Sequence, residues 1–129
     1  MIVDSSAIIA IIFGEPDADE LLRSLMGGEP RMSAATYFET GMVIDRKAED
    51  DFPAKALDRL LGLARIDVVP VTRDHADRAR LAYARFGKGN HPAQLNFGDC
   101  FSYALAADMG EPLLFKGEDF RQTDIVPAV

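Results

Sequence analysis

The first six residues of the chain place a carboxylate between two apolar segments. Ile2 and Val3 lead directly into Asp4, two serines follow, and an apolar run extends from Ala7 to Phe13. This pattern predicts a short buried strand that ends at Asp4 and a helix that begins just after it. Open α/β sheets bind their ligands at the carboxyl ends of their strands, so we expect a site around Asp4.

Length and composition are typical of one folded domain over residues 1–129. The chain is 48% hydrophobic and 27% charged, as in ordinary globular proteins. Its longest apolar run, residues 7–13, is far shorter than the roughly 20 residues that cross a membrane. Asp4 and the lack of a basic segment before this run argue against a signal peptide. We therefore expect a cytoplasmic protein with no membrane segment.

Charge and metal-binding residue types exclude several kinds of site. A single cysteine, Cys100, rules out an internal disulfide and a cysteine zinc cluster, and two histidines make a His-rich metal site improbable. The net charge of −7 argues against nucleic-acid binding through an overall positive field. Binding of nucleic acid stays compatible with this charge if metal offsets a carboxylate cluster. The acidity would also suit a basic protein partner.

Apolar residues at helical spacing, with capping residues and glycines between them, predict six helices. Ser5 or Ser6 is expected to cap the first, and Pro16 to start the second at the favoured first position. With their caps, the helices cover residues 5–13, 16–26, 33–48, 51–64, 72–86 and 97–109. The stripe that should face the core on the third helix consists of Ala35, Phe38 and Met42.

Short apolar segments between these helices predict the strands. They lie at residues 2–3, 31–32, 66–71 and 113–115, with a further candidate at 125–126. Pro70 cannot donate a ladder hydrogen bond, so the 66–71 strand should lie at an edge or end there. Strands that alternate with helices indicate an α/β fold. We expect a central parallel sheet of four to five short strands flanked by helices on both faces.

Four acidic residues border apolar elements and are candidates for one site. Asp4 ends the first strand, Glu39 lies early in the third helix, Asp99 lies in the first turn of the last helix, and Asp119 follows the 113–115 strand. Each also has a plain structural explanation, such as helix capping or a favourable position near the helix dipole. Strand ends and the following helix starts open on the same edge of a parallel sheet, which favours their convergence.

Convergent carboxylates would repel each other unless a cation lies between them. Oxygen ligands suit Mg²⁺, with Mn²⁺ as a substitute. Such ions activate water and stabilise the leaving oxygen of a phosphodiester, so the pattern points to metal-dependent phosphodiester hydrolysis. Ser5 and Ser6 would then position a metal-bound water or a phosphate. A phosphoaspartate enzyme is disfavoured, because the haloacid-dehalogenase type has a second Asp where this chain has Ser6.

Three motifs together resemble the PIN-domain family, and more narrowly the VapC toxins of type II VapBC toxin–antitoxin systems. They are Met1-Ile-Val-Asp-Ser-Ser-Ala7, Asn96-Phe-Gly-Asp-Cys100 and Leu114-Phe-Lys-Gly-Glu-Asp-Phe120, with Glu39 between the first two. The resemblance runs from the first residue to about Val126. It implies a PIN-like fold and a Mg²⁺-dependent endoribonuclease with Asp4, Glu39, Asp99 and Asp119 in an acidic pocket. Asp4 and Asp99 would bind the metal most directly.

The resemblance also bears on partners and on the fourth acid. Many family members carry an acid or Asn where this chain has Gly117, so Glu118 and Asp119 compete for that role, and we favour Asp119. The family implies an RNA substrate, a VapB-type antitoxin whose tail crosses the pocket, and a homodimer. The alternative from another functional class is a non-catalytic PIN-like module that binds proteins. Asp99 pointing to open solvent, away from Asp4, would contradict the nuclease hypothesis.

Overall fold

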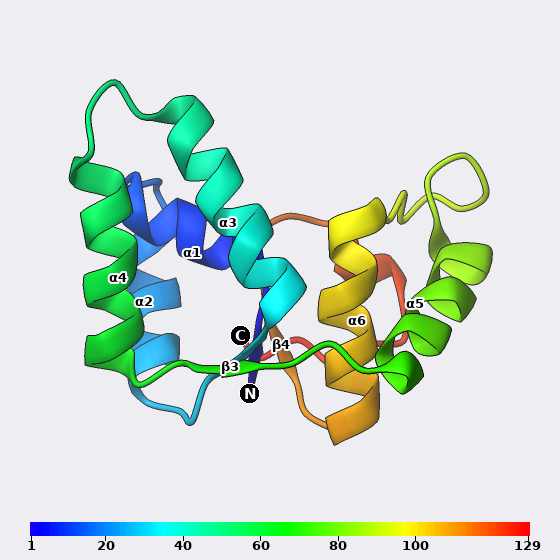
Figure 1. Cartoon of the computed structure of the whole chain (residues 1–129). Helices are drawn as coiled ribbons and strands as arrows, with labels where there is room; N and C mark the ends of the chain where they lie inside the picture. The colour runs from blue at the N-terminus through cyan, green and yellow to red at the C-terminus, as the bar shows by residue number, and fades with distance from the viewer.

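A four-stranded parallel sheet lies at the centre of the computed structural model, which describes residues 1–129 (Figure 1). Its strands pair in the order β3-β2-β1-β4, so β3 is an edge strand as expected. The central strand β1 pairs through Ile2 with Arg31 on one side and Leu113 on the other. The strands are β1 (Ile2–Val3), β2 (Arg31–Ser33), β3 (Asp67–Val69) and β4 (Leu113–Leu114).

Helices cover both faces of this sheet, which confirms the predicted fold class. In Figure 1, α1 to α4 gather on one side of the strands, and α5 and α6 on the other. None of the helices is both long and apolar enough to cross a membrane. The helices are α1 (Ser5–Ile12), α2 (Ala18–Met26), α3 (Ala34–Lys47), α4 (Phe52–Ala64), α5 (Arg73–Phe86) and α6 (Phe97–Met109), and a 3₁₀ turn, η1, spans Phe120–Gln122.

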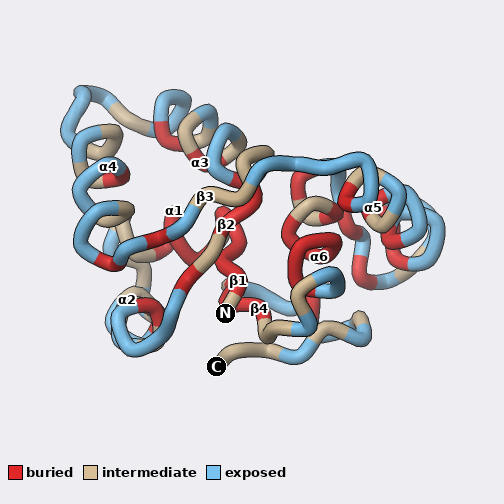
Figure 2. Tube along the Cα trace, turned by 60° about the horizontal axis from the view of Figure 1, so that its bottom comes forward, coloured by how far each residue is buried: buried red, intermediate tan, exposed pale blue.

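The alternation of side chains along the strands divides the core in two. Ile2 and Leu113 pack with α5 and α6, whereas Val3 and Leu114 pack with α1 to α4. Both strand pairs are fully buried, as the red tube at the centre of Figure 2 shows. Strands β1 and β4 are therefore enclosed on both faces, and polar groups gather at the carboxyl edge of the sheet.

Two predicted helix starts are wrong. The cap of α1 is Asp4, not Ser5 or Ser6: its backbone is extended and its carboxylate accepts the Ser6 N–H at 3.0 Å. The second helix begins at Ala18, not Pro16. The Ala18 N–H donates to the Glu15 carbonyl at 2.9 Å, so residues 15–18 form a tight turn before the helix.

The stripe predicted to be buried on α3 is also wrong. Phe38 is 65% exposed and Met42 40% exposed. The fully buried face instead carries Thr36, Thr40 and Ile44. These hydroxyls are tolerated inside because both are bonded: Thr40 donates to the Thr36 carbonyl at 2.7 Å, and Thr36 bonds to a serine of α6.

The candidate strand at residues 125–126 does not form. Leu113 donates to the Val126 carbonyl at 2.9 Å, and Ala128 donates to the Leu113 carbonyl at 2.8 Å. Only an isolated bridge between Leu113 and Pro127 results. Pro127 has no N–H to extend a ladder, so this segment covers the edge of β4 without becoming a strand.

Candidate active site

A pocket of about 520 Å³ opens where β1 ends and α1 begins. Asp4 enters it from the end of β1, Glu39 from α3 and Asp99 from the first turn of α6, and all three line it. Ser5 and Ser6 line the same pocket. The structure therefore brings together three of the acids that the sequence pattern singled out.

Asp4 is held rigidly at the floor of the pocket. It is 1% exposed, and both of its carboxylate oxygens accept hydrogen bonds. Oδ2 accepts from the Ser6 hydroxyl at 2.6 Å as well as from the Ser6 N–H, and Oδ1 accepts from the Ser102 hydroxyl at 2.6 Å. Ser102 was missed in the sequence. Its position three residues after Asp99, on the same face of a helix, was the available signal.

Glu39 reaches the pocket because α6 carries no side chain at Gly98. A Cβ at that position would lie only 1.7 Å from Glu39 Oε2. The Ser5 hydroxyl donates to Oε1 at 2.9 Å. Burial raises the pKa of Glu39, the Ser5 hydrogen bond works in the opposite direction, and the negative charge of Asp4 raises it further.

Asp99 is fixed by a capping box at the start of α6. Its Oδ2 accepts the Asn96 N–H at 2.9 Å, and its own N–H donates to Asn96 Oδ1 at 2.9 Å. Burial raises the pKa of Asp99 to about 7, and Asp4, Glu39 and Asp119 add to the rise, against the Asn96 hydrogen bond. Near neutral pH the fully ionised state of these carboxylates is therefore unfavourable, and a bound cation would stabilise it.

The fourth acid lies outside the pocket lining. Gly117 lines the pocket, whereas Glu118 and Asp119 are exposed in the turn before η1. Asp119 is still near enough for its charge to raise the pKa of Asp99. Glu118 instead lies 3.8 Å from Arg121. These contacts place Asp119 nearer to the acidic site in electrostatic terms than Glu118.

The donor set suits a hard cation chemically, but its present arrangement does not form a closed cage. No three His, Cys, Asp or Glu side chains are placed to hold one metal ion between them. Mg²⁺ commonly binds through one or two carboxylates and keeps several waters, so such a cage is not required. Oδ1 of Asp99 and Oε2 of Glu39 accept no hydrogen bond within the chain, in contrast to both oxygens of Asp4.

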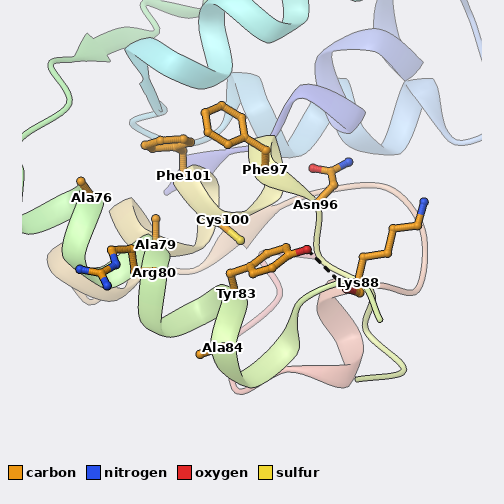
Figure 3. A pocket seen from close by; sticks show the side chains of 10 residues that line it. All are labelled: Ala76, Ala79, Arg80, Tyr83, Ala84, Lys88, Asn96, Phe97, Cys100 and Phe101. Atoms are coloured by element: carbon orange, nitrogen blue, oxygen red, sulfur yellow. Dashed lines mark hydrogen bonds between the residues drawn. The ribbon is translucent and has the colours of Figure 1, made fainter. Parts of the chain in front are cut away.

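A second cavity, of about 730 Å³ and mostly apolar, lies between α5 and α6 (Figure 3). Tyr83, Phe97 and Phe101 line it, and Asn96 borders both this cavity and the acidic pocket. Cys100 points toward it but is buried, and burial, with the charge of Asp99, raises the pKa of its thiol to about 11. These surroundings are those of a buried structural cysteine, not of a reactive thiol.

Comparisons with known proteins converge on one family. The family model described as PIN domain matches residues 1–126. "Ribonuclease VapC" of Mycolicibacterium smegmatis is 51% identical over 127 residues, which cover 97% of each chain. The crystal structure of Mycobacterium tuberculosis VapC20, titled a sarcin-ricin loop cleaving toxin, has a TM-score of 0.78 at 19% identity and covers 97% of this chain and 95% of that one. A toxin–antitoxin complex from Klebsiella pneumoniae has a TM-score of 0.71 at 16% identity, covering 99% and 97%.

Proposed function

The chain belongs to the PIN-domain family, and on that premise we propose that it is a VapC-type endoribonuclease, the toxin of a type II toxin–antitoxin pair acting in the cytoplasm. The observation that carries the proposal is the convergence of Asp4, Glu39 and Asp99 in one pocket at the carboxyl edge of the sheet. A relative that is 51% identical and named a ribonuclease supports RNA as the substrate.

Mg²⁺, or Mn²⁺ in its place, would be held at Asp4 and Asp99, where it would lower the pKa of a bound water and offset charge on the phosphodiester. The chain's own groups prepare this chemistry. Ser6 and Ser102 hold the Asp4 carboxylate in one orientation, and Ser5 does the same for Glu39. Glu39 keeps one carboxylate oxygen free of hydrogen bonds, so it can orient the attacking water or accept its proton.

RNA cleavage by wild type and Asp99→Asn in Mg²⁺ tests the proposal. We expect the variant to lose activity by about a hundredfold or more, because the pocket loses a charge on which the site depends. Asp77→Asn, which alters an exposed acid of α5, is the matched control and should cleave like wild type. An antitoxin-free wild type without activity, or equal activity in wild type and Asp99→Asn, would favour a non-catalytic protein-binding module.

The proposed partner is a VapB-type antitoxin that closes the acidic pocket. The net charge of −7 and the carboxylates around the pocket favour a basic segment as the occupant. Structural similarity to a chain of a toxin–antitoxin complex agrees with such a partner. Co-expression with the cognate antitoxin should yield a complex that does not cleave RNA, and salt should weaken that complex.

A homodimer is also proposed. Leu81 and Tyr83 of α5 and Phe97 of α6 are exposed, and association of two copies could remove such apolar surface from water. Sedimentation should give twice the chain mass for wild type and a lower mass for Leu81→Glu, in which a charge replaces an exposed apolar side chain. A monomeric wild type would contradict the dimer.

A further inference from the structure

Lys116 is bound to the acidic site through its main chain. It follows the buried β4–Phe115 segment, and its backbone N–H donates to the Ser6 hydroxyl at 3.0 Å. That hydroxyl donates in turn to Asp4 Oδ2 at 2.6 Å. The position of Lys116 is therefore set by the same serine that orients Asp4.

The side chain of Lys116 lines the pocket and pairs with the turn before α2. Its ammonium donates to Glu15, which also lines the pocket, and lies 3.4 Å from Asp17 Oδ1. That Asp17 oxygen is buried and accepts no hydrogen bond. The hydrogen bond to Glu15, with Asp17 nearby, raises the pKa of Lys116, so the ammonium keeps its charge. The side chain is still 34% exposed and can be reached from solvent.

An RNA phosphate that enters this pocket meets mostly negative charge. The carboxylates of Asp4, Glu15, Glu39 and Asp99 line it, against the ammonium groups of Lys47 and Lys116. Lys47 lies over the Phe13 ring, 5.6 Å from its centroid, near the end of α3. Lys116 is the cation whose main chain is joined to the Asp4 network. Its ammonium lies against Glu15 and Asp17, in the same pocket that Asp4 lines.

We propose that the Lys116 ammonium is a phosphate-binding group of the RNA site, which Glu15 and Asp17 hold in place until RNA enters. This proposal rests on the proposed ribonuclease function. On binding, the ammonium exchanges its carboxylate partners for a phosphate oxygen, with no change in covalent bonds. Lysine suits this exchange, because its three donors sit on a flexible stem that can turn from one oxygen to another.

The salt dependence of RNA binding tests the contact directly. A labelled single-stranded RNA is titrated in EDTA, which keeps it intact, and binding is followed by fluorescence anisotropy for wild type, Lys116→Met, Lys116→Arg and Lys55→Met. Each lost phosphate contact reduces the slope of log K against log[salt] by about 0.7 for a single strand. Lys116→Met should show a slope smaller by about 0.7 and should bind RNA more weakly. Lys116→Arg should keep the wild-type slope. Lys55→Met should keep it too, because Lys55 is exposed on α4; like Lys116, it is paired with an acid.

Glu15→Gln separates phosphate binding from a merely structural role. It breaks the same ion pair but keeps the ammonium, which then has Asp17 as its remaining acidic neighbour. If Lys116 binds phosphate, Glu15→Gln binds RNA as tightly as wild type or more tightly. If the pair only braces the rim of the pocket, Glu15→Gln and Lys116→Met weaken binding equally, and the proposal is overturned. Melting curves of both variants show whether each is folded.

These measurements distinguish a failure of the Lys116 proposal from a failure of the proposed ribonuclease function. A wild type that binds and cleaves RNA, with an unchanged salt slope in Lys116→Met, overturns the role of Lys116 alone. A wild type that neither binds RNA in EDTA nor cleaves it with Mg²⁺ overturns both. A wild type that binds RNA without cleaving it, with the slope reduced in Lys116→Met, supports the phosphate contact and contradicts the catalytic function.

Discussion

Asp99 couples the acidity of the pocket to the stability of the protein. Its pKa is about 7 in the folded chain, against 3.8 for an ordinary Asp. Between those values the native state binds more protons than the unfolded state, so stability falls as pH rises from about 4 to about 7. In the metal-free protein, ionisation of Asp99 therefore lowers the free energy of unfolding. Asn can replace the carboxylate without this penalty and can still accept the Asn96 N–H.

Urea unfolding in EDTA at pH 5 and pH 8 measures this penalty. We expect Asp99→Asn to be more stable than wild type at pH 8, with the gap in free energy of unfolding wider than at pH 5 by about 2 kcal/mol. Asp99 is partly exposed, so solvent screens its charge and the difference is smaller than the full pKa shift would give. Asp77→Asn, on the exposed face of α5, should follow the wild-type pH dependence. A constant gap between Asp99→Asn and wild type would be inconsistent with a raised pKa at Asp99.

Gly98 tests how closely Glu39 packs against α6. Alanine in place of glycine inside a helix usually adds up to about 1 kcal/mol of stability. Here its Cβ would collide with the end of the Glu39 side chain, so that carboxylate should turn away and lose its bond from Ser5. We expect Gly98→Ala to stay folded and to lose RNA cleavage to the same extent as Glu39→Gln.

Two further variants complete this test. Gly98→Ala combined with Glu39→Gln should cleave no more slowly than either single variant, since both changes act on one carboxylate. Gly62→Ala on α4 has no atom within 4 Å of the added Cβ, so it should keep full activity. Full activity in Gly98→Ala would mean that the position of Glu39 does not matter for cleavage.

At the scale of elements, local signals predicted the starts of α3 and α5 but not the cap of α1 or the start of α2, and distant contacts were not predicted. Ser33 and Thr72 directly precede α3 and α5, and each accepts a backbone N–H from the first turn of its helix. Such bonds join residues two or three apart, so a sequence displays them. The inward face of α3 could not be predicted in this way. Thr36 is buried because its hydroxyl meets Ser102, 66 residues away, and no periodicity reports that partner.

The contact between α3 and α6 supports both the core and the site. The Ser102 hydroxyl lies between Thr36 Oγ1 at 3.1 Å and Asp4 Oδ1 at 2.6 Å. Ser102→Ala leaves both groups without this partner inside the protein. We expect a loss of about 2 kcal/mol in the free energy of unfolding, measured in urea, because buried polar groups would lose a hydrogen bond. Cleavage should fall as well, since Asp4 would no longer be held on both sides.

Ser24→Ala on α2 is the control for this element. Its hydroxyl has only a weak contact, 3.9 Å from the Met1 sulfur, so its stability and activity should match wild type. If Ser102→Ala unfolds at the wild-type urea concentration, the hydrogen bond across α3 and α6 contributes little. The orientation of Asp4 would then depend on Ser6 alone.

Across the whole molecule, the sequence indicated which acids converge. It did not reveal the residues that surround those acids. Asp4, Glu39 and Asp99 each lie next to an apolar segment, and a parallel sheet delivers such positions to one edge. Ser102, Gly98 and Lys116 follow from the packing of separate elements. Ser102 faces the Asp4 carboxylate across the core, and Gly98 leaves space for the Glu39 side chain. Lys116 faces an acid in the turn before α2.

The charge of the whole pocket leads to a prediction about metal binding. Carboxylates of Asp4, Glu39 and Asp99 share one pocket, and burial and mutual repulsion raise the pKa of Asp99 and of Glu39. A cation that binds only the folded chain stabilises it by about 2.7 kcal/mol at a concentration a hundred times its Kd. Mg²⁺ should therefore raise the melting temperature at pH 8, by roughly 3–5 °C per kcal/mol for a domain of this size.

Differential scanning fluorimetry at constant ionic strength, with KCl replacing MgCl₂, separates specific binding from screening. Asp4→Asn should lose most of the Mg²⁺-dependent rise, because the acid at the centre of the pocket loses its charge. Asp77→Asn should keep it. The rise should also shrink toward pH 5, where Asp99 takes up a proton that competes with the metal. Equal melting temperatures in MgCl₂ and KCl would count against a metal site in this pocket, whatever the RNA cleavage assay shows.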